Sequence, residues 1–176
     1  MLAYVFWHRP ATTAGYEDAL VAFHRTLAGD PPPGFRGSAA LRLDAAPWLP
    51  GNDPAYEDWY LVEDWSALGS LNAHAAAGAR APAHDAVAHI AASGSGGVYA
   101  LIAGPVAPPQ GGRTAWLAKP AGLAYGAFHA ELERILPPAA QAWQRQMTLG
   151  PAFEYAVVGA AVPWPATERR FDAVAD

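Results

Sequence analysis

The sequence contains no cysteine, and this absence excludes several kinds of site. Disulfide bonds, nucleophilic thiolates, cysteine-bound zinc and iron–sulfur clusters all require it. Charged residues are also few: they make up 15% of the 176 residues, and the net charge is −5 with no cluster of Lys and Arg. A nucleic-acid groove needs a basic stripe that displaces counterions, so the sequence predicts no nucleic-acid partner.

Long hydrophobic runs are missing as well. No window reaches the ~18 apolar residues that a membrane span requires, and the N-terminus lacks the basic start and apolar core of a signal peptide. We therefore expect no membrane partner and a cytoplasmic location. Hydrophobic residues nevertheless make up 52% of the chain, which is ample for a folded core and unlike a disordered protein.

The first hundred residues alternate between strand-like and helix-like patterns. Over 16–27 the apolar residues recur at helical spacing, and Thr12 or Thr13 can cap the helix that they form. Over 35–44 apolar and polar residues alternate, which is typical of a strand with one buried face. The same reasoning predicts strands over 2–8, 56–64 and 98–103, helices over 66–74 (capped by Ser66) and 82–92, and a turn over 94–97.

The order of these elements is β-α-β-β-α-β, which is the order of the ferredoxin-like split β-α-β unit. We therefore predict an α+β fold, a ferredoxin-like sandwich of a sheet and two helices, in a first domain over residues 1–105. A linker rich in Pro and Gly follows at 105–112.

The pattern then restarts in the second half of the chain. It predicts a strand over 114–118, a helix over 125–135 and strands over 141–149 and 153–160, with a turn at Gly150-Pro151. The remaining residues are too few for a full second helix and strand. We therefore predict a tandem arrangement in which residues 113–176 form a degenerate second ferredoxin-like repeat, packed sheet to sheet on the first. The molecule would be a monomer with pseudo-dimeric halves or a homodimer.

Histidines are the main candidates for chemistry, because the sequence has no Gly-x-Ser-x-Gly elbow, no phosphate-binding loop and no dinucleotide fingerprint. The histidines make no recognised metal spacing: His84 and His89 lie about 140° apart around a helix. His8 shares one side of the first strand with Tyr4 and Phe6. We predict a flattened apolar pocket between sheet and helices, edged by His8 and His74 and lined by aromatic residues: Tyr4, Phe6, Trp59, Tyr60 and Trp65.

Two segments, 63–74 and 83–88, resemble antibiotic-biosynthesis-monooxygenase-like and EthD-like proteins of the dimeric α/β-barrel superfamily. In that family a strand ends in an acidic residue and Trp, here Asp64-Trp65, and two helices separated by small residues follow. The resemblance implies a dimeric α/β-barrel-like fold and, in some members, cofactor-independent oxygenase activity. In the haem-degrading branch a haem-ligating His lies near the position of His84.

Three functions follow from the pocket and the resemblance. The first is small-molecule binding or cofactor-independent oxygenation of a small apolar or aromatic molecule, in which His8 or His74 takes a proton from a phenol-like substrate and the resulting anion reacts with oxygen. The second is haem binding through His84. The third is a non-catalytic assembly domain.

Overall fold

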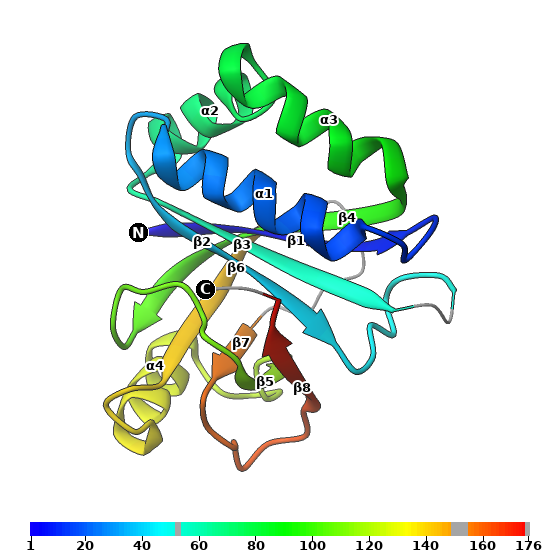
Figure 1. The fold of residues 1–176 in the computed structure, drawn as a ribbon. Coiled ribbons are helices and arrows are strands. Elements are labelled where there is room, and N and C mark those ends of the chain that lie inside the picture. Colours follow the sequence, from blue (N-terminus) through cyan, green and yellow to red (C-terminus); the bar gives the residue numbers. More distant parts are fainter. Residues whose placement is uncertain (52–53, 149–154, 175–176) are drawn as a thin grey trace.

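A computed structural model describes residues 1–51, 54–148 and 155–174 (Figure 1). Eight antiparallel strands form one closed barrel, in the order β1-β3-β2-β8-β5-β7-β6-β4. The strands are β1 (Leu2–Pro10), β2 (Phe35–Leu43), β3 (Ala55–Val62), β4 (Ala91–Ala103), β5 (Gly112–Leu117), β6 (Gln141–Thr148), β7 (Tyr155–Val158) and β8 (Thr167–Ala173). The helices are α1 (Tyr16–Gly29), α2 (Trp65–His74), a short 3-10 turn η1 (Gly78–Arg80), α3 (Ala81–Ile90) and α4 (Tyr125–Ile135).

The predicted fold class, an α+β ferredoxin-like sandwich in tandem, is wrong. Two separate sheets do not stack face to face. Instead, β2 and β4 of the first half pair with β8 and β6 of the second, so that both halves contribute strands to one barrel. Each described strand pairs with two neighbours, so the barrel avoids the open edge strands of two separate sheets, which is its physical advantage. The end of the chain was predicted to be too short for a helix and a strand together; a strand alone, β8, forms there and follows β7 directly in the element order.

The lumen of the barrel is filled by large side chains. Tryptophans on four strands, Trp7, Trp59, Trp116 and Trp143, are almost fully buried there. The ring centroids of Trp7 and Trp116 lie 5.2 Å apart, and those of Trp59 and Trp143 lie 5.5 Å apart. Such edge-on packing is favourable for aromatic rings. The barrel interior is therefore a packed core, and any ligand site has to lie outside it.

The helices cover two areas of the outer surface. Figure 1 shows α1, α2 and α3 together over the strands of the first half, whereas α4 lies on the other half. The predicted stripe of α1 is confirmed, since its four apolar residues are its buried ones: Tyr16, Leu20, Phe23 and Leu27. In α4 the buried residues are Phe128 and Leu132. Within the described ranges, no helix has both the length and the apolar character to span a bilayer.

Two predicted helix caps are wrong. The residue before α1 is Gly15, in the left-handed region at φ 72°, and no side chain caps that end. The cap of α2 is Asp64, whose carboxylate accepts a hydrogen bond from the backbone N–H of Ala67, so the helix starts one residue before the predicted cap, Ser66. The predicted turn at Gly150-Pro151 lies outside the described residues.

The glycines at 94–97 lie in β4, not in a turn, because α3 ends at Ile90 and the strand starts at Ala91. The cause is close contact across the sheet. A Cβ atom at Gly94 would collide with the ring of Phe6, and one at Gly96 would lie 2.7 Å from the hydroxyl of Tyr4. The two β1 rings therefore occupy the space that a side chain at either glycine of the neighbouring strand would need.

This contact makes Gly94→Ala a disruptive substitution. We expect a loss of about 1–3 kcal/mol in the free energy of unfolding, because the Phe6 ring has to move. The matched control is Gly126→Ala in α4, where a Cβ atom would meet nothing within 4 Å and no loss is expected. Urea unfolding of both variants measures the difference, and equal stabilities would contradict this role of Gly94.

Candidate functional site

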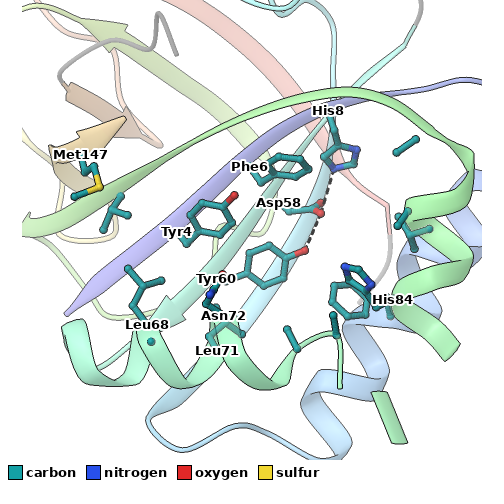
Figure 2. A pocket seen from close by; sticks show the side chains of 18 of the residues that line it. Tyr4, Phe6, His8, Asp58, Tyr60, Leu68, Leu71, Asn72, His84 and Met147 are labelled. Atoms are coloured by element: carbon teal, nitrogen blue, oxygen red, sulfur yellow. Dashed lines mark hydrogen bonds and ion pairs between the residues drawn. The ribbon is translucent and has the colours of Figure 1, made fainter. Parts of the chain in front are cut away.

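A pocket of about 840 Å³ lies between the outer face of β1 and β3 and the helices α1, α2 and α3 (Figure 2). Its floor carries Tyr4, Phe6 and Tyr60, whose rings stand roughly parallel with centroids 6.1 Å apart from one neighbour to the next. Figure 2 places His8 and Asp58 at one end and Met147 at the other. Both Met147 and Trp65 line the pocket and are about half exposed, so solvent reaches the pocket on their side.

His8 is held from both sides at the polar end. It comes from the outer face of β1 and is 1% exposed. Its Nδ1 lies 2.5 Å from the hydroxyl of Tyr16, and its Nε2 lies 3.1 Å from Oδ2 of Asp58. The contact between Nε2 and Asp58 is not aligned as a hydrogen bond, and it is an ion pair when the imidazole is protonated. The ring also lies flat against Phe6 and Tyr56, which fixes its plane.

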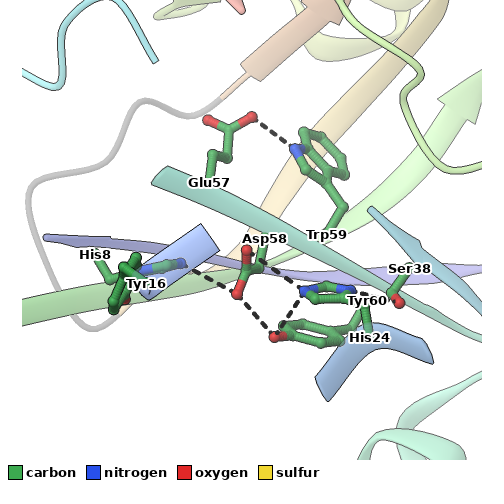
Figure 3. Close-up of polar contacts among 8 residues, drawn as sticks. All are labelled: His8, Tyr16, His24, Ser38, Glu57, Asp58, Trp59 and Tyr60. Atoms are coloured by element: carbon green, nitrogen blue, oxygen red, sulfur yellow. Dashed lines mark hydrogen bonds and ion pairs between the residues drawn. The ribbon is translucent and has the colours of Figure 1, made fainter. Parts of the chain in front are cut away.

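Asp58 is the only carboxylate among the described residues that line the pocket, and it is 2% exposed. Its position follows from β3, in which both faces are buried: Asp58 points outward beneath α1, and Glu57 points into the barrel. Tyr60 donates a 2.9 Å hydrogen bond to Oδ2 of Asp58, and Nε2 of His24 lies 3.6 Å from Oδ1 (Figure 3). One buried carboxylate therefore meets two histidines and a phenol.

The charges around Asp58 decide its ionisation. Burial raises its pKa, but the charges of His8 and His24 lower it more, so the pKa of this carboxyl lies well below its ordinary value. Burial, and after it the charge of Asp58, raises the pKa of Tyr16 and of Tyr60 above the ordinary range. Asp58 is thus the anion of the site, and the phenols are neutral hydrogen-bond donors.

Glu57, on the other face of the same strand, is a separate buried acid. It is 0% exposed, and its two carboxylate oxygens accept hydrogen bonds of 2.6 Å each from the indoles of Trp7 and Trp59. Burial raises the pKa of Glu57 to about 7, although both indole hydrogen bonds lower it. Glu57 belongs to the barrel core and does not line the pocket.

Most of the predicted pocket residues share this pocket. Tyr4, Phe6, Tyr60 and Trp65 line it, and so does the predicted catalytic residue His8. Trp59 does not line it: it points into the barrel, because residues that follow one another in a strand face opposite sides. His74 is also outside the lining. It is exposed at the end of α2, and its Nδ1 lies 2.8 Å from the carbonyl oxygen of Ser70.

His84, the predicted haem ligand, lines the pocket from α3 and contacts its neighbour Asp85 at 3.0 Å. A haem brings two propionates. Among the described residues of the lining there is no Lys or Arg to pair with them, and Asp58 repels them. The pocket therefore fits a haem poorly, and we derive no chemical step through one. Haem ligation by His84 stays a prediction.

Sequence reasoning missed three residues of the site: Tyr16, His24 and Asp58. Tyr16 belongs to the apolar stripe over 16–27, which predicted a helix and no site, and no spacing singled out His24. For Asp58 a signal existed, since Glu57-Asp58 interrupts a strand that is otherwise apolar and aromatic on both faces. A carboxylate in such a strand has to be buried, and buried carboxylates need partners.

Comparison of the chain with protein-family models finds no match, and comparison with curated proteins finds no significant one. The resemblance to the monooxygenase-like family therefore stays a prediction from two short segments.

Proposed function

We propose that the pocket binds a small, largely apolar or aromatic molecule with one weakly acidic hydroxyl, and that His8 accepts the proton of that hydroxyl. The observation that carries this proposal is the fixed position of His8 between Asp58 and Tyr16 at the polar end of an apolar pocket. A neutral histidine suits proton transfer near pH 7. The single carboxylate and the lack of cationic side chains in the described lining favour a neutral ligand over a carboxylate or phosphate.

The contacts of His8 suggest the path of the proton. Because Asp58 is ionised, the proton of neutral His8 belongs on Nε2, facing the carboxylate, and Nδ1 accepts from the hydroxyl of Tyr16. Tyr16 also lines the pocket. We infer that the ligand hydroxyl gives its proton to the Tyr16 oxygen while Tyr16 gives its own to Nδ1. The products are an ionised ligand and an imidazolium that Asp58 stabilises.

The volume of the pocket favours binding over a role in assembly alone. A water molecule occupies about 30 Å³ of liquid, so a pocket of about 840 Å³ is far larger than a site for a few waters. The cofactor-independent oxygenase expected from the sequence would begin with the same proton transfer, and its oxygen step stays a prediction.

The test uses 4-nitrophenol, whose ionised form is yellow. At a pH slightly below the ordinary pKa of this phenol, the wild-type protein is expected to shift bound phenol toward phenolate, and His8→Gln is expected to reduce that shift by about tenfold or more, which corresponds to one pKa unit. His74→Gln is the matched control and should leave the absorbance unchanged, because His74 does not line the pocket. Equal ionisation by wild type and His8→Gln would remove His8 as the base.

A further inference from the structure

Asp58 connects the pocket to a second histidine that does not line it. His8 on β1 lines the pocket, whereas His24 comes from α1 and is absent from the lining. Figure 3 shows the two imidazoles on either side of the carboxylate. Oδ2 of Asp58 lies 3.1 Å from His8, and Oδ1 lies 3.6 Å from His24.

His24 also leads away from the pocket. Its Nδ1 lies 2.7 Å from the hydroxyl oxygen of Ser38 on β2, and its side chain is 11% exposed, whereas that of His8 is 2% exposed. Its ring stacks on Tyr60 with centroids 5.1 Å apart, and its Nε2 lies 3.5 Å from the Tyr60 hydroxyl. His24 is therefore held in place beside Asp58 and reaches toward partly exposed residues.

The charges around His8, Asp58 and His24 allow one of the two imidazoles to be protonated more easily than both. A single carboxylate balances one imidazolium, and a second protonated imidazole would leave a buried positive charge without an anion. The other titratable groups at the carboxylate, Tyr4, Tyr16 and Tyr60, are phenols with raised pKa values and supply no charge. Behind His8, Tyr56 contacts the ion pair of Glu17 and Arg42, and Glu57 lies on the opposite face of β3.

We propose that His8 and His24 share a single proton through Asp58, and that His24 carries this proton between the pocket and the surface. In each transfer the carboxylate of Asp58 turns to align Oδ2 with Nε2 of His8 and takes the proton there. The protonated carboxyl group then turns about its Cβ–Cγ bond, so that the same O–H faces His24 and passes the proton to Nε2. His24 then releases its other proton from Nδ1 at Ser38, so that no net charge is left behind. The sharing of the proton does not depend on the proposed function. The transfer to His24 rests on that function, because it lets His8, the proposed base, lose the proton that it has accepted.

The test of sharing is an NMR titration of the imidazole nitrogens in 15N-histidine-labelled protein. In the wild type we expect His8 and His24 to titrate together in two steps at least about one pH unit apart, each residue showing a fractional change in both steps. In His24→Gln the biphasic curve of His8 should become a single step. His89→Gln removes an exposed histidine of α3 and should leave both curves as in the wild type. Two independent single-step curves in the wild type would overturn the proposal.

The test of the route is hydrogen–deuterium exchange at the imidazole nitrogens of His8. Because His8 is almost fully buried, we expect the His24→Gln variant to lose fast exchange at Nε2, whereas the control His89→Gln should exchange as in the wild type. Unchanged exchange would overturn the route. A wild-type protein that fails to ionise nitrophenol yet shows the two-step titration would contradict only the proposed function, so the two failures are distinguishable.

Discussion

The Asp58→Asn variant is expected to lose about 3 kcal/mol of folding free energy at pH 7. Asp58 is buried, and its carboxylate is ionised because two histidines lower its pKa. Removing the anion leaves two buried imidazoles and the Tyr60 hydroxyl without the charged group that they contact, and the loss of such a buried charged partner is among the most costly substitutions. Urea unfolding at pH 7 measures the loss. The variant should also fail to ionise 4-nitrophenol, because the imidazolium of His8 is then unsupported.

The pH dependence of this loss has a defined sign. The pKa of Asp58 is lower in the folded than in the unfolded protein, so its contribution is fully present above the unfolded carboxyl pKa and is lost as the pH falls below it. Wild type and variant should therefore converge in acid. Asp85→Asn is the matched control: Asp85 contacts His84 at 3.0 Å, but its side chain is 73% exposed, so we expect a change within about 0.5 kcal/mol. Similar losses of stability in Asp58→Asn and Asp85→Asn would contradict the claim that the buried position of Asp58 makes its substitution costly.

Replacing Glu57 with Gln is expected to remove a pH dependence of stability. Burial raises the pKa of Glu57 from 4.5 to about 7. The folded protein therefore binds more protons than the unfolded chain between these pH values, and stability falls as the pH rises through this range. This rise of about 2.5 units in the pKa corresponds to a loss of about 3 kcal/mol in the free energy of unfolding once Glu57 is ionised. This loss of stability is absent below the pKa of Glu57 in the unfolded chain and complete above its pKa in the folded protein.

The measurement is urea unfolding of wild type and Glu57→Gln at several pH values. Gln has one oxygen for two indole donors, so we expect the variant to be less stable by about 1–3 kcal/mol at low pH and to lose this deficit at alkaline pH. The fluorescence of Trp7 and Trp59 offers a second readout. A constant difference between the two proteins at every pH would mean that Glu57 does not titrate in this range.

The sequence predicted local elements better than their assembly. Hydrophobic periodicity located α1 and the strands β1, β2 and β3 to within a few residues. It failed at β4, where the glycines look like a turn until the rings of Phe6 and Tyr4 on the neighbouring strand are considered. It also failed on the fold class, because barrel closure depends on which strand edges meet, and the side-chain pattern does not encode edges.

The site was partly predictable for a related reason. Alternation along β1 correctly grouped Tyr4, Phe6 and His8. The same alternation along β3 places Trp59 opposite Tyr60, so assigning both to one pocket floor contradicted the pattern itself. The contacts of Asp58 come from β1, β3 and α1, and such a meeting of distant segments is visible only in three dimensions.

The most direct test of the central claim is a crystal structure of the protein soaked with 4-nitrophenol. The proposal predicts the phenol ring over Tyr4, Phe6 and Tyr60, with its phenolic oxygen within hydrogen-bond distance of the Tyr16 hydroxyl and the nitro group directed toward Met147. A ligand bound elsewhere, one turned so that its phenolic oxygen points to Met147, or a pocket filled by the protein's own side chains would contradict the account.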